Sequence, residues 1–177
     1  ESLSIAKVRV VAHSFGGRVA VYLASHRPEM VEQMVLTGAA GIRKPLTETQ
    51  KKRQARFKRM NAILNALKRL RLLRAMVERR RYGSADYARL NENMRRTFSK
   101  VISQDLYPFL KDIQAPTLLV WGSEDTETPL WMGDQMEKAI PDAGLVVFEG
   151  RTHFAFIEEW QRFLTIVRQF FWGGQTA

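Results

Sequence analysis

The sequence predicts an α/β fold in which a parallel sheet of about four strands is flanked by helices and interrupted by a helical insertion. Short β-branched and apolar runs recur along the chain, and each ends near a glycine or another small residue. Such runs are typical of strands buried on both faces of a sheet, and alternation of strand and helix favours parallel pairing. The four predicted strands cover residues 8–12, 34–36, 117–121 and 145–148.

Helical periodicity follows the first and the last of these strands. Apolar residues recur at helical spacing from Val19 to Ala24, and Pro28 stops that helix. A second helix near the C-terminus is predicted to pack one apolar face on the sheet and to end at Gly173. The residues of that face are Ile157, Trp160, Phe163, Leu164, Val167 and Phe171.

The middle of the chain is strongly basic. Residues 42–100 hold 19 of the 28 lysines and arginines but four of the 18 acidic residues, a formal charge of +15, whereas the remainder sums to −5. Thr47 with Gln50 resembles a capping box, Gly83 breaks the pattern, and Ser84 can cap a second helix that ends before Pro108. We predict two amphipathic helices here, with apolar stripes formed by Phe57, Met60, Ile63, Leu64, Leu67, Leu70 and Val77, and by Tyr87, Leu90, Met94, Phe98 and Val101.

Composition excludes several classes of protein. The chain has 177 residues, 45% of them hydrophobic and 26% charged, which excludes a disordered or fibrous chain. It has no cysteine, so it can form neither a disulfide framework nor a thiolate metal site. No apolar run reaches the roughly 18 residues of a membrane span and no basic-then-apolar leader opens the chain, so we expect a cytoplasmic protein. Because it begins at Glu1 rather than methionine, we also expect that an N-terminal portion lies elsewhere.

A candidate nucleophile stands where the first strand turns into its helix. In the run Ala-His-Ser-Phe-Gly-Gly, Ser14 lies between Ala12 and Gly16, and a sharp strand-to-helix turn needs small residues at those two places. This run resembles the nucleophile elbow of the α/β-hydrolase superfamily, with alanine at position 12 where glycine is usual. The resemblance implies a partial α/β-hydrolase fold and makes Ser14 the catalytic nucleophile.

Two further loops match the superfamily in its order of serine, acid and histidine. The run Trp-Gly-Ser-Glu-Asp after the third strand resembles the acid loop and points to Asp125, while Gly-Arg-Thr-His-Phe after the fourth resembles the histidine loop and points to His153. We interpret Glu124 and Glu127 as solvated loop acids, His13 as a packing residue beside the nucleophile, and His26 as a residue that complements a helix end. The predicted catalytic residues are therefore Ser14, Asp125 and His153.

The resemblance also implies a chemistry and an organisation. His153 takes the Ser14 proton, Asp125 orients His153, an acyl-enzyme forms, and the backbone N–H of Phe15 is one oxyanion donor. In the superfamily a second donor follows an earlier strand, which this chain lacks before residue 8, so we expect the isolated chain to be inactive. Residues 1–40 and 112–177 are predicted to form the hydrolase core, and residues 41–111 its helical cap.

The predicted function is hydrolysis of a small or medium carboxylic ester or related acyl substrate, without a cofactor or metal. Thioester, amide, carbon–carbon and perhydrolase chemistry stay open. The alternative is a catalytically silent binding module whose basic cap docks on an anionic membrane surface or partner. The first strand should leave an open edge for a complementing N-terminal segment or a second copy. Nucleic-acid binding is not expected, because the basic stretch lacks interleaved aromatic residues.

Overall fold

The computed structural model describes residues 6–43, 48–69 and 91–173. The chain divides into two compact units, one comprising Glu1–Arg43 with Ile102–Ala177 and the other Lys44–Val101. The first unit contains every strand that the structure describes. No helix in the described ranges is long and apolar enough to cross a membrane.

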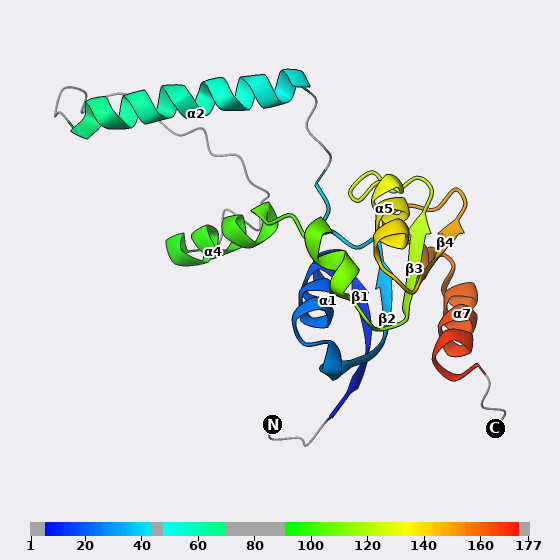
Figure 1. Ribbon diagram of the computed structural model, residues 1–177. Coiled ribbons are helices and arrows are strands. Elements are labelled where there is room, and N and C mark those ends of the chain that lie inside the picture. Colours follow the sequence, from blue (N-terminus) through cyan, green and yellow to red (C-terminus); the bar gives the residue numbers. More distant parts are fainter. Residues whose placement is uncertain (1–5, 44–47, 70–90, 174–177) are drawn as a thin grey trace. The chain divides into compact units, whose positions relative to one another are not determined.

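The first unit is built on a parallel four-stranded sheet in the order β1-β2-β3-β4 (Figure 1). Its strands are β1 (Val8–His13), β2 (Val31–Thr37), β3 (Thr117–Gly122) and β4 (Ala143–Phe148). All four predicted strands are confirmed, and β2 and β4 begin earlier than their apolar runs suggest. Every neighbouring pair is parallel, as β1–β2, β2–β3 and β3–β4. The carboxyl ends of all four strands therefore lie along one rim of the sheet.

Alternation of side chains across the strands creates two separate cores. In β2, Met34 and Leu36 belong to one cluster and Val35 to the other, as expected for a strand buried on both faces. In β3 the same alternation divides Leu119 from Val120. Helices cover both faces, so the sheet is the middle layer of three.

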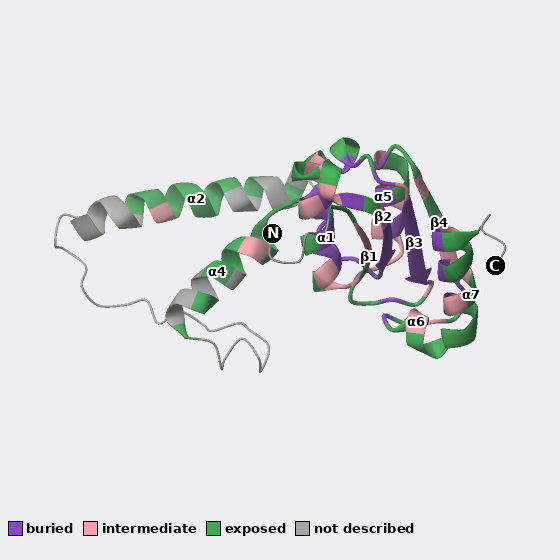
Figure 2. Ribbon diagram, turned by 90° about the horizontal axis from the view of Figure 1, so that it is seen from below, coloured by how far each residue is buried: buried purple, intermediate pink, exposed green. Residues whose placement is uncertain are grey.

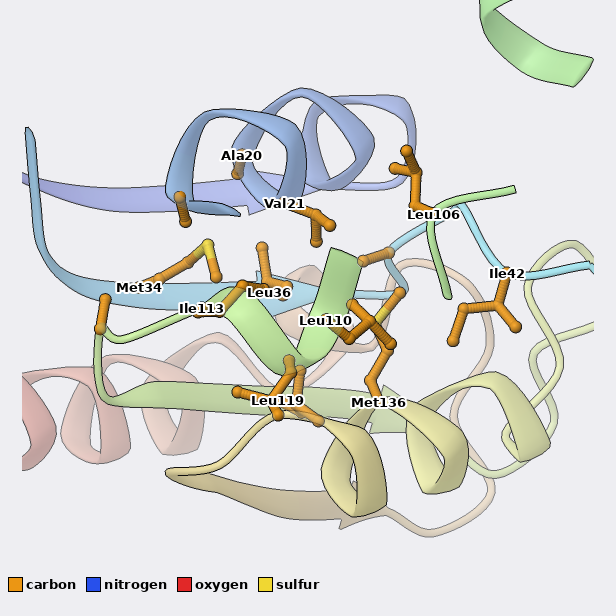
Figure 3. Close-up of a cluster of buried hydrophobic side chains, with 14 of the residues drawn as sticks. Ala20, Val21, Met34, Leu36, Ile42, Leu106, Leu110, Ile113, Leu119 and Met136 are labelled. Atoms are coloured by element: carbon orange, nitrogen blue, oxygen red, sulfur yellow. The ribbon is translucent and has the colours of Figure 1, made fainter. Parts of the chain in front are cut away.

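The first core lies under α1 (Phe15–His26), α5 (Trp131–Ala139) and the 3₁₀ segment η2 (Tyr107–Asp112). Figure 3 shows Val21 from α1, Leu110 from η2 and Met136 from α5 converging on the strands. All three side chains are fully buried. This core fixes α1, and with it the turn that carries Ser14, against the sheet.

The second core lies under α6 (Ala155–Glu158) and α7 (Trp160–Trp172), on the opposite face. The predicted C-terminal helix is present, but its apolar face is shorter than the sequence suggests. Phe163, Val167 and Phe171 are buried, whereas Ile157 and Trp160 are 60% and 49% exposed. The reason is a break at Glu159, where α6 ends and the chain turns before α7 begins.

Strand β1 is the edge of the described sheet and is poorly covered. None of its six residues is buried, whereas all six residues of β3 are buried (Figure 2). Val11 points to the α7 face of the sheet and is 54% exposed, while its register partner Val35 is fully buried. Val19 and Tyr22 of α1 are also exposed. This part of the surface carries apolar side chains that the described residues do not cover.

The second unit contains α2 (Glu48–Arg69) and most of α4 (Glu92–Ser103). Both predicted amphipathic helices therefore have a described helical counterpart. Phe57, Met60 and Ile63 of the first predicted stripe are exposed, as is Met94 of the second. The predicted cap at Thr47 and break at Gly83 lie outside the described residues, as do Leu70, Val77, Ser84, Tyr87 and Leu90.

Candidate active site

Ser14 occupies the strained turn between β1 and α1. Its φ is +50° and its ψ −115°, and it is the only non-glycine residue with positive φ in the described ranges. A non-glycine residue held in such a region costs about 1–3 kcal/mol and persists only where its surroundings impose it. Here the Ser14 N–H donates to Thr37 O at 3.0 Å, and Ser14 O accepts from the N–H groups of Gly17 and Ala40.

Small residues around Ser14 allow the strand to reverse into the helix. A β-carbon placed on Gly16 would lie 3.8 Å from the Ala12 methyl group, which is ordinary van der Waals contact. The alanine at position 12 therefore fits the turn without displacing it. A β-carbon on Gly17 would collide with Ala39, so this glycine lets α1 approach the segment after β2 closely.

Asp125 is buried in the loop after β3 and is held by three donors. Its Oδ1 accepts from the backbone N–H groups of Glu127 (2.9 Å) and Thr128 (2.8 Å), and its Oδ2 lies 2.8 Å from Thr128 Oγ1. Thr128 Oγ1 is also 2.9 Å from Gly38 O. The single Thr128 proton can serve one of these acceptors at a time. Together these contacts hold the carboxylate in one orientation.

His153 and Asp125 form a buried pair. His153 Nδ1 lies 2.8 Å from Asp125 Oδ2, and both side chains are almost wholly removed from solvent. Because an ionised carboxylate only accepts, Nδ1 carries the proton and Nε2 is left with a lone pair. Gly38 makes room for the pair. Its φ is +47°, and a β-carbon there would approach His153 Nδ1 to 3.0 Å and Asp125 Oδ2 to 3.1 Å.

The acid and histidine loops are joined by hydrogen bonds of their own. Gly150 N–H donates to Ser123 Oγ at 2.8 Å, and Glu124 N–H donates to Arg151 O at 2.9 Å. Gly122 lets the two loops meet, since a β-carbon at this position would collide with the carbonyl oxygens of Arg151 and Thr152. The His153–Asp125 pair is therefore fixed by both backbone and side chains.

Ser14 lies at the same rim of the sheet as this pair, through its neighbour His13. The rings of His13 and His153 are 4.6 Å apart between centroids. Among the described residues, however, the Ser14 hydroxyl makes no hydrogen bond. His153 Nε2, the nitrogen with the lone pair, instead has Glu127 Oε2 at 3.6 Å. The structure thus brings His153 and Asp125 into contact and places Ser14 at the same rim of the sheet, next in sequence to the His13 ring that contacts His153.

His13 has a defined environment of its own. Its Nδ1 is 3.0 Å from Thr37 O and 2.9 Å from Thr37 Oγ1, and its ring also packs against Phe154 and Phe156. Burial lowers the pKa of His13 below its ordinary value of 6.5, and the nearby His153 lowers it further. The Thr37 carbonyl, Asp125 and Glu127 act in the opposite direction with smaller effect. His13 is therefore neutral over a wider pH range than a free imidazole.

Phe15 begins α1, so its backbone N–H stands at the helix N-terminus directly after Ser14. His26, by contrast, is the last residue of α1, and its Nδ1 donates to Tyr22 O at 3.0 Å. It is exposed and stacked on Tyr22, with ring centroids 4.0 Å apart. His26 is a local helix-end residue and lies outside the site.

Sequence reasoning missed three contributors to the site. Thr128 could have been found, because a hydroxyl three residues after a loop aspartate can cap it. Gly38 directly follows β2, and the sequence indicates only that a strand ends there, not that this glycine makes room for His153 and Asp125. Glu127 was interpreted as a solvated acid and is indeed 65% exposed, yet its carboxylate oxygen lies 3.6 Å from His153 Nε2. That contact depends on the path of the loop, which no local pattern specifies.

Comparison with known proteins identifies the family. The model of the "Alpha/beta hydrolase family" matches residues 2–166. The chain belongs to the alpha/beta hydrolase family. The four-stranded sheet with its helical layers is part of that fold.

Individual relatives of this hydrolase-family chain include two enzymes of related name. It is 30% identical to a 2-hydroxymuconate semialdehyde hydrolase of Pseudomonas putida over 180 residues, covering 96% of this chain and 64% of the relative. It is 28% identical over 191 residues to a 2-hydroxy-6-oxononadienedioate/2-hydroxy-6-oxononatrienedioate hydrolase of Escherichia coli, with the same two coverages. The chain thus spans less than two thirds of the length of these curated relatives.

Solved structures agree with this relationship. A crystal structure of a variant of the meta-cleavage product hydrolase CumD, an enzyme of Pseudomonas fluorescens IP01, superposes with a TM-score of 0.63 at 27% identity. The match covers 96% of this chain and 66% of that one. The share of the solved structure that this chain covers, 66%, is therefore close to the share of the relatives' sequences that it covers, 64%.

Proposed function

We propose that this chain is the part of a serine hydrolase that carries the catalytic triad, with Ser14 as nucleophile, His153 as general base and Asp125 as the residue that orients His153. The observation that carries the proposal is the buried 2.8 Å His153–Asp125 pair at the same rim of the sheet as the serine held at φ +50°. A serine in a strained strand-to-helix turn, at the same rim of the sheet as an oriented imidazole, is the arrangement that activates a hydroxyl for attack.

The mechanism follows from the protonation states in the site. As the Ser14 oxygen attacks a substrate carbonyl, its proton moves to His153 Nε2, whose lone pair is unused by the Asp125 contact. The resulting imidazolium is stabilised by Asp125 at Nδ1, and the nearby Glu127 carboxylate adds a second negative charge on the Nε2 side. The proton then passes to the leaving group, and water cleaves the acyl-enzyme by the same steps.

Charge on the carbonyl oxygen requires N–H donors. The Phe15 N–H at the start of α1 is the first donor in this proposal, supported by the helix dipole. We expect a second donor from outside the residues of this chain, which spans less than two thirds of its relatives' length. Loss of one such donor typically costs about 10²- to 10³-fold in rate, so we expect the chain alone to turn over substrate at least that much more slowly than the native polypeptide.

The substrate class is a carbonyl compound with a small or medium acyl part. Carboxylic esters are one candidate. The compounds in the names of the two relatives bear aldehyde, ketone and carboxylate groups but no ester, so hydrolysis of those compounds breaks a carbon–carbon bond beside a carbonyl. The same Ser14 attack serves both reactions, which makes a ring-cleavage-type 2-hydroxy-6-oxo acid the first alternative to a simple ester.

The decisive experiment is covalent labelling of the native polypeptide, including any residues that precede Glu1, with a fluorophosphonate. We expect one adduct, at Ser14, seen by intact-mass measurement and peptide mapping. Ser14→Ala should abolish it, and His153→Gln should slow it by several orders of magnitude, since removing a triad member typically leaves about 10³- to 10⁴-fold catalysis over water. Ser25→Ala, on the exposed side of α1, is the matched control and should label normally. An adduct that persists in Ser14→Ala would contradict the proposal.

Turnover assays then separate the substrate classes. Hydrolysis of p-nitrophenyl esters of graded chain length measures acyl preference, and loss of the ultraviolet absorbance of a 2-hydroxy-6-oxo dienoic acid measures carbon–carbon cleavage. If Ser14-dependent turnover occurs only with the second substrate, the ester assignment is wrong while the triad stands.

A second candidate function is docking of the basic helix α2 on an anionic membrane surface. Its Phe57, Met60 and Ile63 are exposed, and so are Lys52, Arg56, Lys58 and Arg59. A basic helix with an apolar face binds anionic headgroups, at about 1 kcal/mol for each basic residue near the surface. Sedimentation with phosphatidylserine vesicles at low and high salt tests this function. Salt-sensitive binding that Arg56→Glu with Arg59→Glu removes would support it, and equal recovery with neutral vesicles would exclude it.

The open edge of β1 is the remaining interaction surface. We propose that a further strand, from the upstream part of the polypeptide or from a second copy of this chain, pairs with β1 and covers Val11 and Tyr22. Light scattering after size exclusion distinguishes the sources. The isolated chain should form dimers if a second copy pairs there, and Val11→Lys should dissociate them.

A further inference from the structure

The histidine beside the nucleophile has contacts that the proposed mechanism does not use. His13 is the last residue of β1. Its ring has Thr37 O near Nδ1, and its centroid lies 4.6 Å from the centroid of the His153 ring. Phe154 and Phe156 complete the surroundings, with ring centroids 5.3 Å and 4.8 Å away. A packing residue needs only volume, whereas this ring also has a fixed hydrogen bond and a titratable neighbour.

The hydrogen bond determines which nitrogen of His13 carries its proton. Two oxygens of Thr37 lie near His13 Nδ1, the carbonyl oxygen at 3.0 Å and the hydroxyl oxygen at 2.9 Å. The carbonyl oxygen can only accept, so we assign the proton to Nδ1, and the hydroxyl oxygen then accepts as well. Neutral His13 is therefore the Nδ1–H tautomer with an unprotonated Nε2. Thr37 O also accepts from Ser14 N–H at 3.0 Å, so the same carbonyl fixes the nucleophile turn and the His13 ring.

We propose that His13 is a positioning residue for His153: anchored by Thr37, its neutral ring packs on the His153 imidazole and holds it at the rim where Ser14 stands. This inference rests on the proposed role of His153 as general base. A neutral aromatic face is compatible with an imidazolium at His153, whereas a second cation at this distance opposes it. A charged His153 therefore disfavours protonation of His13.

The charged groups around His13 support this coupling. His153 faces it from the loop after β4, and Asp125 and Glu127 face it from the loop after β3. The two carboxylates favour a charged His13, yet burial and His153 outweigh them and the pKa of His13 falls below 6.5. On its own strand and on β2, no titratable side chain is among the groups that shift this pKa.

The first test reads the two rings directly and does not require activity. The chain has three histidines, so nitrogen-15 NMR of histidine-labelled protein can follow each ring, with assignments from His13→Phe, His26→Phe and His153→Gln. We expect the Nδ1–H tautomer at His13, a pKa below 6.5, and a rise of that pKa in His153→Gln. An Nε2–H tautomer, or a titration that His153→Gln leaves unchanged, would overturn the proposal.

The second test separates positioning from volume. Fluorophosphonate labelling of Ser14 should slow by about 10-fold or more in His13→Ala, because a small misplacement of a reacting group can cost up to about 10²-fold. His13→Phe keeps an aromatic ring on His153 and should lose less, with a pH profile altered on its acid side. His26→Phe is the control, since His26 lies outside the site.

The two failures are distinguishable. Absence of Ser14 labelling in the unaltered native polypeptide would refute the proposed function, while the NMR titrations would still decide the coupling of the two rings. Labelling of His13→Ala at the unaltered rate, with circular dichroism confirming that it folds, would refute positioning alone. His13→Phe keeps the test meaningful if His13→Ala does not fold, because it retains a ring that fills the space between His153, Phe154 and Phe156.

Discussion

The two sides of the candidate site are supported in different ways. Asp125 extends from the loop after β3 and His153 from the loop after β4; both are buried, and they share hydrogen bonds with each other and with Thr128. Ser14 extends from β1, whose residues are all at least partly exposed, and its hydroxyl has no hydrogen bond among the described residues. The acid–histidine side is therefore held by contacts within this chain, whereas the serine side depends on an edge strand.

The largest expected effect is on the acid–histidine side. Asp125→Asn should reduce labelling of Ser14 by about 10⁴-fold, because an amide in this place favours the wrong His153 tautomer and removes the charge that stabilises the imidazolium. The measurement is the second-order rate of fluorophosphonate labelling in the native polypeptide. Glu124→Gln, in the same loop, is the control and should react normally. A loss smaller than tenfold in Asp125→Asn would mean that another carboxylate, with Glu127 nearest, orients His153.

The free energy of unfolding should depend more on the buried strand β3 than on the partly exposed edge strand β1. Leu119→Ala in β3 removes a fully buried side chain and should lower the free energy of unfolding by about 2–5 kcal/mol. Val11→Ala in β1 removes a side chain that is 54% exposed and should cost less than about 0.5 kcal/mol. Urea denaturation of the chain measures both values. A large loss from Val11→Ala would show that the β1 edge is covered in solution by a second copy.

The serine turn should gain stability from a residue that tolerates positive φ. Ser14→Gly should raise the free energy of unfolding by about 1 kcal/mol, because glycine adopts this conformation without the strain of a β-carbon. Ser14→Ala removes the same hydroxyl but keeps the β-carbon, so it should show no such gain. If the two variants are equally stable, the turn holds no strain.

The smallest expected effect is the pH dependence that His13 adds to stability. Its pKa is lowered in the folded chain, so near pH 6.5 the unfolded chain binds more protons and folding is disfavoured as the pH falls. This loss begins near the ordinary pKa of 6.5 and ends below the lowered one. His13→Phe should therefore lose stability less steeply than the unaltered chain as pH falls from 7 toward 5. The free energy of unfolding of both proteins is measured by urea denaturation at each pH. If it falls equally steeply with pH in His13→Phe and in the unaltered chain, the pKa of His13 is not lowered.

Most of the fold could be predicted because strands and glycines carry strong local signals. The run from Val8 leads into Ser14 and α1 as expected, and the four-stranded parallel sheet is confirmed. The break between α6 and α7 was not predictable from periodicity, since Ile157 and Trp160 continue the apolar spacing across it. Apolar spacing shows where a helix could pack, but tertiary contacts decide where it ends.

The candidate residues of the site could be predicted from the sequence, but the contacts between them could not. Chain order and loop residues pointed to Ser14, Asp125 and His153, and the structure joins the last two. The catalytic roles of all three stay predictions. Glu127 was interpreted as a solvated loop acid and His13 as a packing residue. Glu127 approaches His153 because of the path of its loop, and His13 does so because β1 pairs with β2 at the same rim. Pairings between distant segments leave no periodic signature.

The hydrogen bonds between the acid and histidine loops have a consequence for the order of folding. His153 and Asp125 are separated by 28 positions along the chain, and their loops meet through Ser123 with Gly150 and through Glu124 with Arg151. Closing so short a segment costs little chain entropy, whereas bringing Ser14 to the same site closes a much longer loop that contains the whole basic insertion. The proton acceptor should therefore assemble early, and the hydroxyl it serves should arrive last.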